Sequence, residues 1–213
     1  MVELYNTYGD MLLRAIGVHT LYVLVSVLLG FIIGLLLGIL FSRIPKWSFV
    51  ILPIMSIFQT IPGLVFIGVL FLLIGMTPLT VIIALTVYAI FPVMKNTLTG
   101  ILCVDKQYVE AAYGCGMTWQ QVLTHVELPL AMPTIIAGLR MSAIYTVSWA
   151  VLAAMIGLGG LGDFIYQGTT SNNNTLILLG AIPAAILAIA LGSLIDLLQK
   201  KVTPRGLRKE VRK

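Results

Sequence analysis

The polar residues of this chain do not assemble a catalytic set, and their types and spacing instead suit contact with another protein. Residues 110–129 run E-A-A-Y-G-C-G-M-T-W-Q-Q-V-L-T-H-V-E-L-P, a polar stretch between strongly apolar ones. No paired carboxylates, no nucleophile with a recognisable base and no His or Cys ligand cluster occur. The glycine-rich phosphate-binding sequence ending in Lys followed by Ser or Thr is also missing. We therefore expect no enzyme activity, cofactor or metal in this chain, and a protein-binding role for residues 110–129.

The composition is that of a membrane protein. Of 213 residues, 59% are hydrophobic and only 10% are charged, and the mean hydropathy is +1.04. A helix needs about 20 apolar residues to cross roughly 30 Å of hydrocarbon, and lipid cannot satisfy an open backbone. Hydropathy therefore predicts an all-α integral membrane protein with five transmembrane helices, at residues 19–42, 50–74, 78–100, 132–156 and 175–198.

These spans define one membrane domain with two flanking segments. We expect residues 1–18 to form an external N-terminal segment without the features of a cleaved signal. Residues 19–200 form the transmembrane domain, with a cytoplasmic loop at about 103–130, and residues 201–213 form a basic cytoplasmic tail.

The orientation follows from the basic residues, because positively charged loops stay in the cytoplasm. With the N-terminus outside and the C-terminus inside, the inner side holds most of them: Arg43, Lys46, Lys106, Lys200, Lys201, Arg205, Arg208, Lys209, Arg212 and Lys213. The net charge of +5 then reflects topology and contact with anionic lipid, and we expect no nucleic-acid partner. Cys103 and Cys115 also lie on the inner side, where thiols stay reduced.

The loop predicts two short helices. The first carries small and apolar residues on one face, at Tyr108, Ala111, Ala112 and Cys115. Gly114 or Gly116 is expected to end it. Thr118 and Gln121 are spaced as a capping box for the second helix. Its apolar stripe comprises Trp119, Val122, Leu123 and Val126, and Pro129 is expected to stop it before the fourth span.

At these positions the chain resembles the permease subunits of bacterial ABC importers. The family carries Glu-Ala-Ala, then Gly, then Ile-x-Leu-Pro at fixed spacing in its cytoplasmic loop. The matching residues here are Glu110, Ala111, Ala112, Gly116, Leu128 and Pro129, with Val126 in place of the Ile. The resemblance implies a methionine-permease-like fold and a coupling helix, containing Thr118, Trp119 and Val122, that sits in a groove of an ATPase subunit.

The resemblance extends beyond the loop to the osmoprotectant branch of the family, which imports glycine betaine, carnitine and choline. The segments that carry it are Q-T-I-P-G at 59–63, Y-A at 88–89, N-T at 96–97, G-L-G-G-L-G-D at 157–163 and G-A-I-P-A at 180–184. Methionine permeases share the loop motif and a glycine-rich outer segment, so methionine is an alternative cargo.

The resemblance also implies partners and a mechanism. Because the chain has no phosphate-binding sequence, ATP and Mg²⁺ would bind a separate ATPase dimer. A second permease, identical or paralogous, and an extracytoplasmic substrate-binding protein complete the assembly in the bacterial inner membrane. Closure of the ATPases would carry the coupling helix and rock the spans as rigid units.

Polar residues within the second span are candidates for a gate. Pro62 removes a backbone donor, so this span should kink or break there, and a full break would give six helices instead of five. Gln59 and Thr60 could re-satisfy the freed backbone groups or face a water-filled path. A kinked helix with self-satisfied polar groups explains the same residues.

Four further residues have a functional and a structural interpretation. Tyr145 and Trp149 lie one helical turn apart and could present ring faces to a cationic cargo, or simply pack. Asp163 could attract cargo or dock a binding protein at the outer mouth, although a cap in a glycine-rich turn is the simpler interpretation. Arg140 can reach the membrane interface and is interpreted as an anchor.

A secondary transporter coupled to protons or sodium is the alternative from another class. Proton coupling normally needs a carboxylate at membrane depth, and no predicted span carries one at its centre; Asp196 lies at the end of the last. Sodium could still bind backbone carbonyls at a broken helix near Pro62.

Overall fold

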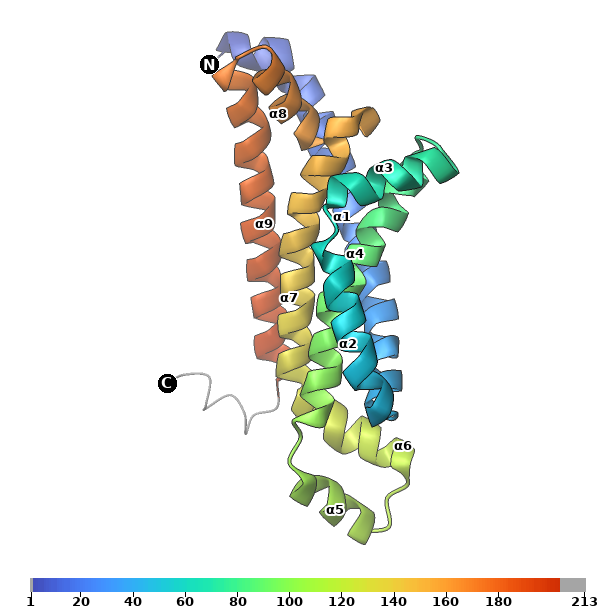
Figure 1. Cartoon of the computed structure of the whole chain (residues 1–213). Coiled ribbons are helices and arrows are strands. Elements are labelled where there is room, and N and C mark those ends of the chain that lie inside the picture. Colours follow the sequence, from blue (N-terminus) through green and yellow to red (C-terminus); the bar gives the residue numbers. More distant parts are fainter. Residues whose placement is uncertain (1, 204–213) are drawn as a thin grey trace.

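The chain forms a bundle of long helices with a short helical loop at one end. The computed structural model describes residues 2–203, with side chains throughout except at 2–7, 45–49, 55, 58, 59, 155 and 156. Its described elements are all helical, and four stretches are long and apolar enough to cross a membrane. These stretches are Tyr8–Ser42, Pro78–Leu102, Trp119–Ala153 and Asn174–Val202. They run along the long axis of the molecule (Figure 1).

Helices α1 (Val2–Ser42) and α4 (Pro78–Leu102) form the most extensive packing contact of the bundle. Three glycines of α1, spaced one turn apart, make this contact possible. A Cβ atom at Gly34 would lie 2.8 Å from the Ile90 carbonyl oxygen, and one at Gly38 would lie 2.6 Å from Cβ of Thr97. Small residues at such spacing let helix backbones approach closely in membranes. Helix α1 also begins at Val2, so the segment expected before the first span continues it as helix.

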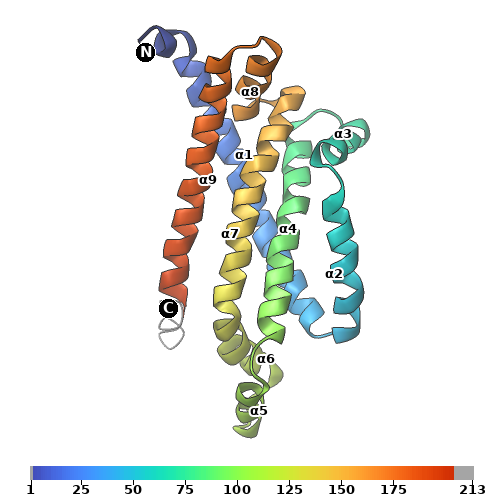
Figure 2. The same cartoon turned by 60° about the vertical axis from the view of Figure 1, so that its left-hand side comes forward.

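The predicted second span is broken into two helices. Helix α2 (Pro45–Thr60) ends just before Pro62, and α3 (Gly63–Ile74) begins just after it. The 16 residues of α2 cover about 24 Å at 1.5 Å per residue. Helix α3 then lies across the end of the bundle instead of along it, as both views show (Figures 1 and 2). The break at Pro62 is confirmed, but α3 adds no sixth crossing.

The loop between α4 and the next long helix projects from the bundle. It contains α5 (Lys106–Gly114) and α6 (Trp119–Val122), at what we call the loop end (Figure 2). The prediction that Pro129 stops the second short helix is wrong. A π-helical turn, η1 (Leu123–Glu127), joins α6 directly to α7 (Leu128–Ala153). There the Leu128 N–H donates to the Leu123 carbonyl, and this wider turn accommodates a proline that would clash in a regular α-helix.

The other end of the bundle is built from a glycine-rich turn and a short helix. Helix α7 continues into a second π-helical turn, η2 (Ala154–Leu158), in which Gly157 has a non-helical backbone with φ of 90°. Helix α8 (Leu161–Thr170) then packs against the start of α9 (Asn174–Val202). The Tyr22 hydroxyl of α1 donates to the Leu158 carbonyl at 3.3 Å, which ties this turn to the bundle.

Helices α7 and α9 lie side by side and complete the bundle. Gln199 of α9 donates from Nε2 to the Pro133 carbonyl at 3.3 Å. Arg140, interpreted above as an interface anchor, makes an ion pair with Asp196 of α9, with 2.9 Å between Nε and Oδ1. Of the basic tail expected at 201–213, residues 204–213 lie outside the described part of the chain.

Candidate functional site

Helix α5 places the first half of the 110–129 motif on the surface. Asp105 caps the helix, because its carboxylate accepts the Gln107 N–H at 2.9 Å. Within the helix Ala112 is buried, whereas Glu110 and Ala111 are exposed. The helix thus uses one small residue to pack and leaves a carboxylate and a small residue free for a partner.

A tight turn connects α5 to α6. Gly116 has φ of 81°, a left-handed conformation that residues with a side chain rarely adopt. Gly114 is the last residue of α5, so the helix ends there and Gly116 makes the turn. The predicted capping box is confirmed. Gln121 donates its N–H to Thr118 Oγ1 at 3.4 Å, and Thr118 donates its N–H to Gln121 Oε1 at 2.8 Å.

The second half of the motif divides into an inner and an outer face. Val122 is fully buried, and Leu128 packs against the apolar cluster at this end of the bundle. Trp119, which was predicted on the same stripe as Val122, is 55% exposed. Pro129 is half-buried at the start of α7. An exposed Trp at a short, rigidly capped helix is typical of a surface that another protein covers.

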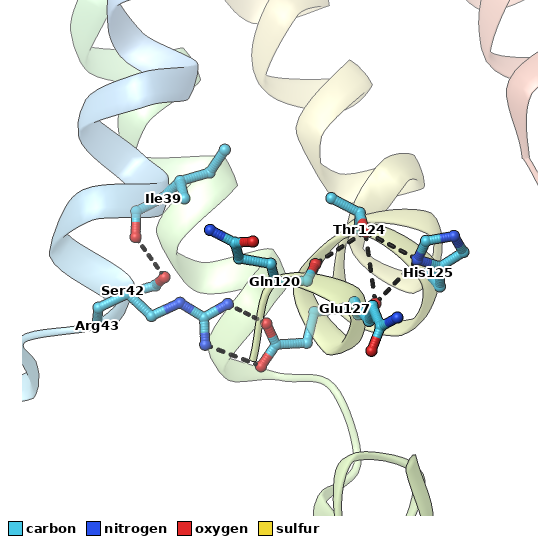
Figure 3. Close-up of polar contacts among 8 residues, drawn as sticks. Ile39, Ser42, Arg43, Gln120, Thr124, His125 and Glu127 are labelled. Carbon is cyan, nitrogen blue, oxygen red and sulfur yellow. Dashed lines mark hydrogen bonds and ion pairs between the residues drawn. The ribbon is translucent and has the colours of Figure 1, made fainter. Parts of the chain in front are cut away.

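A buried carboxylate ties this loop to the first helix, and sequence reasoning missed it. Glu127 of η1 is 7% exposed and makes a two-contact ion pair with Arg43, just beyond the end of α1 (Figure 3). Nη1 of Arg43 lies 3.3 Å from Oε1, and Nη2 bonds Oε2. Paired, parallel N–H bonds of this kind also fix geometry. The two residues are far apart in sequence, so no local pattern could have joined them.

The break between α2 and α3 is surrounded by aromatic side chains. The Tyr88 hydroxyl of α4 donates to the Ile61 carbonyl at 3.0 Å, and thus satisfies a backbone group at the break. Tyr88 also stacks on Trp149 of α7, with ring centroids 4.6 Å apart, and meets Phe66 of α3 edge-on at 5.4 Å. A Cβ atom at Gly63 would overlap the Trp149 ring, so this position must lack a side chain.

Some of the predicted gate and path residues lie at this break, and others do not. Thr60 bonds within its own helix, from Oγ1 to the Ile57 carbonyl at 2.6 Å. Pro62 precedes α3 with extended ψ of 125°. The side chain of Gln59 lies outside the described residues. Of the aromatic pair, Trp149 faces the break, whereas Tyr145 is 47% exposed and is not brought to the same cluster.

Asp163 lies in the first turn of α8, at the end of the bundle opposite the loop. The cap interpretation of Asp163 is wrong, because Gly160 occupies the cap position and no side chain caps the helix. Its charge still suits the positive end of the helix dipole. Burial raises the pKa of this carboxyl above its usual value. The described residues contain no group of three His, Cys, Asp or Glu side chains that could hold a metal.

Comparisons with known proteins agree with this geometry. The family described as "Binding-protein-dependent transport system inner membrane component" matches residues 21–207. The carnitine transport permease protein OpuCB of Listeria monocytogenes is 38% identical, over 98% of this chain and 95% of its own length. The glycine betaine/carnitine/choline transport system permease protein OpuCB of Bacillus subtilis (strain 168) is 40% identical, over 98% and 96%. A solved structure of the MetNI methionine ABC transporter, in an inward facing conformation, has a TM-score of 0.82 at 24% identity, covering 93% of this chain and 99% of that chain.

The solved structure shares this fold, a bundle of membrane-length helices with a projecting helical loop. The family match and the relatives identify the class as a transport permease subunit. The chain belongs to the family of binding-protein-dependent transport system inner membrane components.

Proposed function

We propose that this chain is the permease subunit of an ABC importer for a quaternary ammonium compatible solute such as glycine betaine, carnitine or choline. The observation that carries this proposal is the rigid, exposed α5–α6 loop, which is capped at Asp105 and Thr118 and displays Glu110 and Trp119. Because the sequence contains no phosphate-binding motif of its own, ATP binds a separate ATPase dimer. That dimer docks on the α5–α6 loop.

The cargo is supported by the relatives. Three relatives whose names include carnitine, glycine betaine or choline match nearly the full length at 38–40% identity. The methionine transporter structure supports the fold, at 24% identity. Quaternary ammonium compounds are therefore the first class to test, with methionine as the comparison. Capture by ring faces would occur mainly in the external binding protein.

Transport proceeds by alternating access. ATP binding brings the two ATPases together, the α5–α6 loop moves with them, and the long helices move as rigid bodies. The break between α2 and α3 acts as the gate, because Tyr88 and Trp149 can change their contacts there without unfolding a helix. In this proposal a second permease subunit forms the other wall of the path, the loop end faces the cytoplasm, and α8 with Asp163 faces the binding protein.

Vesicle uptake with the complete set of subunits tests the cargo. Proteoliposomes containing the permease, ATPase and binding protein should accumulate betaine, choline or carnitine only when ATP is supplied. Methionine supplied in parallel should not accumulate. Accumulation by the permease alone, in the absence of nucleotide, would instead establish the ion-coupled transporter.

Two substitutions test the docking surface. Glu110→Lys reverses an exposed charge, and Gly116→Val forces a side chain into a left-handed turn. Both variants should still insert into the membrane, lose co-purifying ATPase and lose uptake. Gly114→Ala is the matched control, because this residue has ordinary backbone angles and a Cβ atom there meets nothing within 4 Å. Unchanged ATPase association in both variants would exclude this loop as the docking site.

A further inference from the structure

The ion pair between Arg43 and Glu127 joins two places where one helical element leads into the next. Glu127 is the last residue of η1, which continues α6 into α7. Arg43 lies in the short turn between α1 and α2, where its N–H donates to the Leu40 carbonyl at 3.2 Å. The pair thus joins the root of the projecting loop directly to the turn that leads into α2 (Figure 3).

The chemistry of this pair makes it a stiff connection. Nη1 of Arg43 donates to Oε1 of Glu127 and Nη2 donates to Oε2, and this two-contact arrangement fixes orientation as well as distance. The Glu127 side chain is only 9% exposed, so solvent screens the pair weakly on that side. The turn on the Arg43 side is itself held, because Ser42 donates from Oγ to the Ile39 carbonyl at 2.7 Å.

The two helices that meet at Arg43 are held to very different extents. Helix α1 is locked against α4 through Gly30, Gly34 and Gly38, where the backbones are in close approach. Helix α2 packs far less extensively against α1 and α4 within the described residues. A displacement applied at Arg43 therefore moves α2 more readily than α1. At its far end α2 meets the break, where Tyr88 and Trp149 surround Ile61 to Gly63.

We infer that the Arg43–Glu127 pair transmits movement of the α5–α6 loop to α2, and through α2 to the break at Pro62. This inference rests on the proposed docking of an ATPase at the loop. Arg43 and Glu127 are positioning residues in this scheme, because neither touches the cargo or the nucleotide. Helix α2 carries the displacement from the loop end to the break.

The ratio of solute transported to ATP hydrolysed tests this link. In the complete importer, Arg43→Gln should leave ATPase association and ATP hydrolysis near the wild-type level. Solute moved per ATP should fall at least roughly five-fold, the lower range of coupling between distant sites. The exchange variant, Arg43→Glu with Glu127→Arg, restores an ion pair with reversed charges, and it should recover most of the lost ratio. Glu127→Gln keeps the shape of the side chain and should behave as Arg43→Gln does.

Arg140→Gln is the matched control, because it breaks a different ion pair, with Asp196, away from the loop. It should leave the ratio of uptake to ATP hydrolysis unchanged. A wild-type ratio in Arg43→Gln would overturn the inference, as would an exchange variant no better than the single variants. Equal loss of hydrolysis and uptake would also overturn it, because it would indicate a structural role alone. If even the wild-type chain fails to bind the ATPase, the proposed function fails first.

Discussion

At position 63 the break between α2 and α3 depends on the absence of a side chain. A Cβ atom there would overlap the Trp149 ring. We expect Gly63→Ala to displace Trp149 from Tyr88, to cost about 1–3 kcal/mol of stability as overpacking does, and to reduce uptake. Thermal unfolding in detergent and vesicle uptake measure both effects. Gly68→Ala, in the same helix with nothing within 4 Å of the added Cβ atom, should unfold no earlier than wild type. Equal melting temperatures for the two variants would refute this packing argument.

The carboxyl of Asp163 makes the free energy of unfolding depend on pH, with a sign that can be predicted. Because burial raises its pKa, the folded chain keeps this proton at pH values where the unfolded chain has lost it. The free energy of unfolding therefore falls as pH rises through the folded-state pKa. We expect acidification from neutral pH to raise the melting temperature of the wild type more than that of Asp163→Asn. Parallel melting profiles for the two proteins across that range would contradict this assignment.

Sequence reasoning located the loop residues better than their partners. The Thr118–Gln121 box and the turn at Gly116 were predictable, because both depend on residues within a few positions. The contact of Tyr88 with Ile61 and the pairing of Arg43 with Glu127 depend on how helices pack side by side. No periodicity within one helix encodes such contacts, so a structure was needed to find them.

At the scale of helices, the contact between α1 and α4 is the most extensive in the bundle. A Cβ atom at Gly34 would lie 2.8 Å from the Ile90 carbonyl and 2.9 Å from Val93 Cβ, both on a neighbouring helix that cannot easily move. We expect Gly34→Ala to separate the two helices and to cost about 1–3 kcal/mol. Gly17→Ala in the same helix meets nothing within 4 Å and is the matched control. Melting temperatures in detergent distinguish the variants, and an undiminished value for Gly34→Ala would show that the contact is loose.

Helix boundaries were predictable where one residue decides them and not where two effects compete. Pro62 has no backbone donor, and the second span breaks there as expected. Pro129 also lacks a donor, yet the chain passes it within one continuous helical stretch, because η1 widens the preceding turn. Helix α3 meets α4 through the edge-on contact of Phe66 with Tyr88, which composition alone does not specify.

At the scale of the whole molecule, the proposed functions lie at two ends: ATPase docking at one and the gate at the other. The loop end presents a rigid polar surface, and the opposite end holds the break and the glycine-rich turn. The long helices between them present apolar side chains outward, such as Leu28, Leu36 and Ile186, which suits lipid or another apolar subunit. Binding at one end can therefore affect the other only through rigid helices and the contacts at their junctions.

The proposed orientation places both native cysteines inside the cell, where they can report on it. Cys103 and Cys115 are free and exposed at the loop end, and Ser171 is exposed in the turn between α8 and α9. In intact cells, a membrane-impermeant maleimide should leave Cys103 and Cys115 of the wild-type chain unlabelled. In a variant whose own two cysteines are replaced by Ala, the same reagent should label Ser171→Cys. In permeabilised cells the reagent also reaches the inner face, so Cys103 and Cys115 should become labelled. The basic residues of the loop end, such as Arg43 and Lys106, predict this result through the positive-inside rule. Labelling of Cys103 or Cys115 from outside would invert the topology and place the α5–α6 loop beyond the reach of a cytoplasmic ATPase.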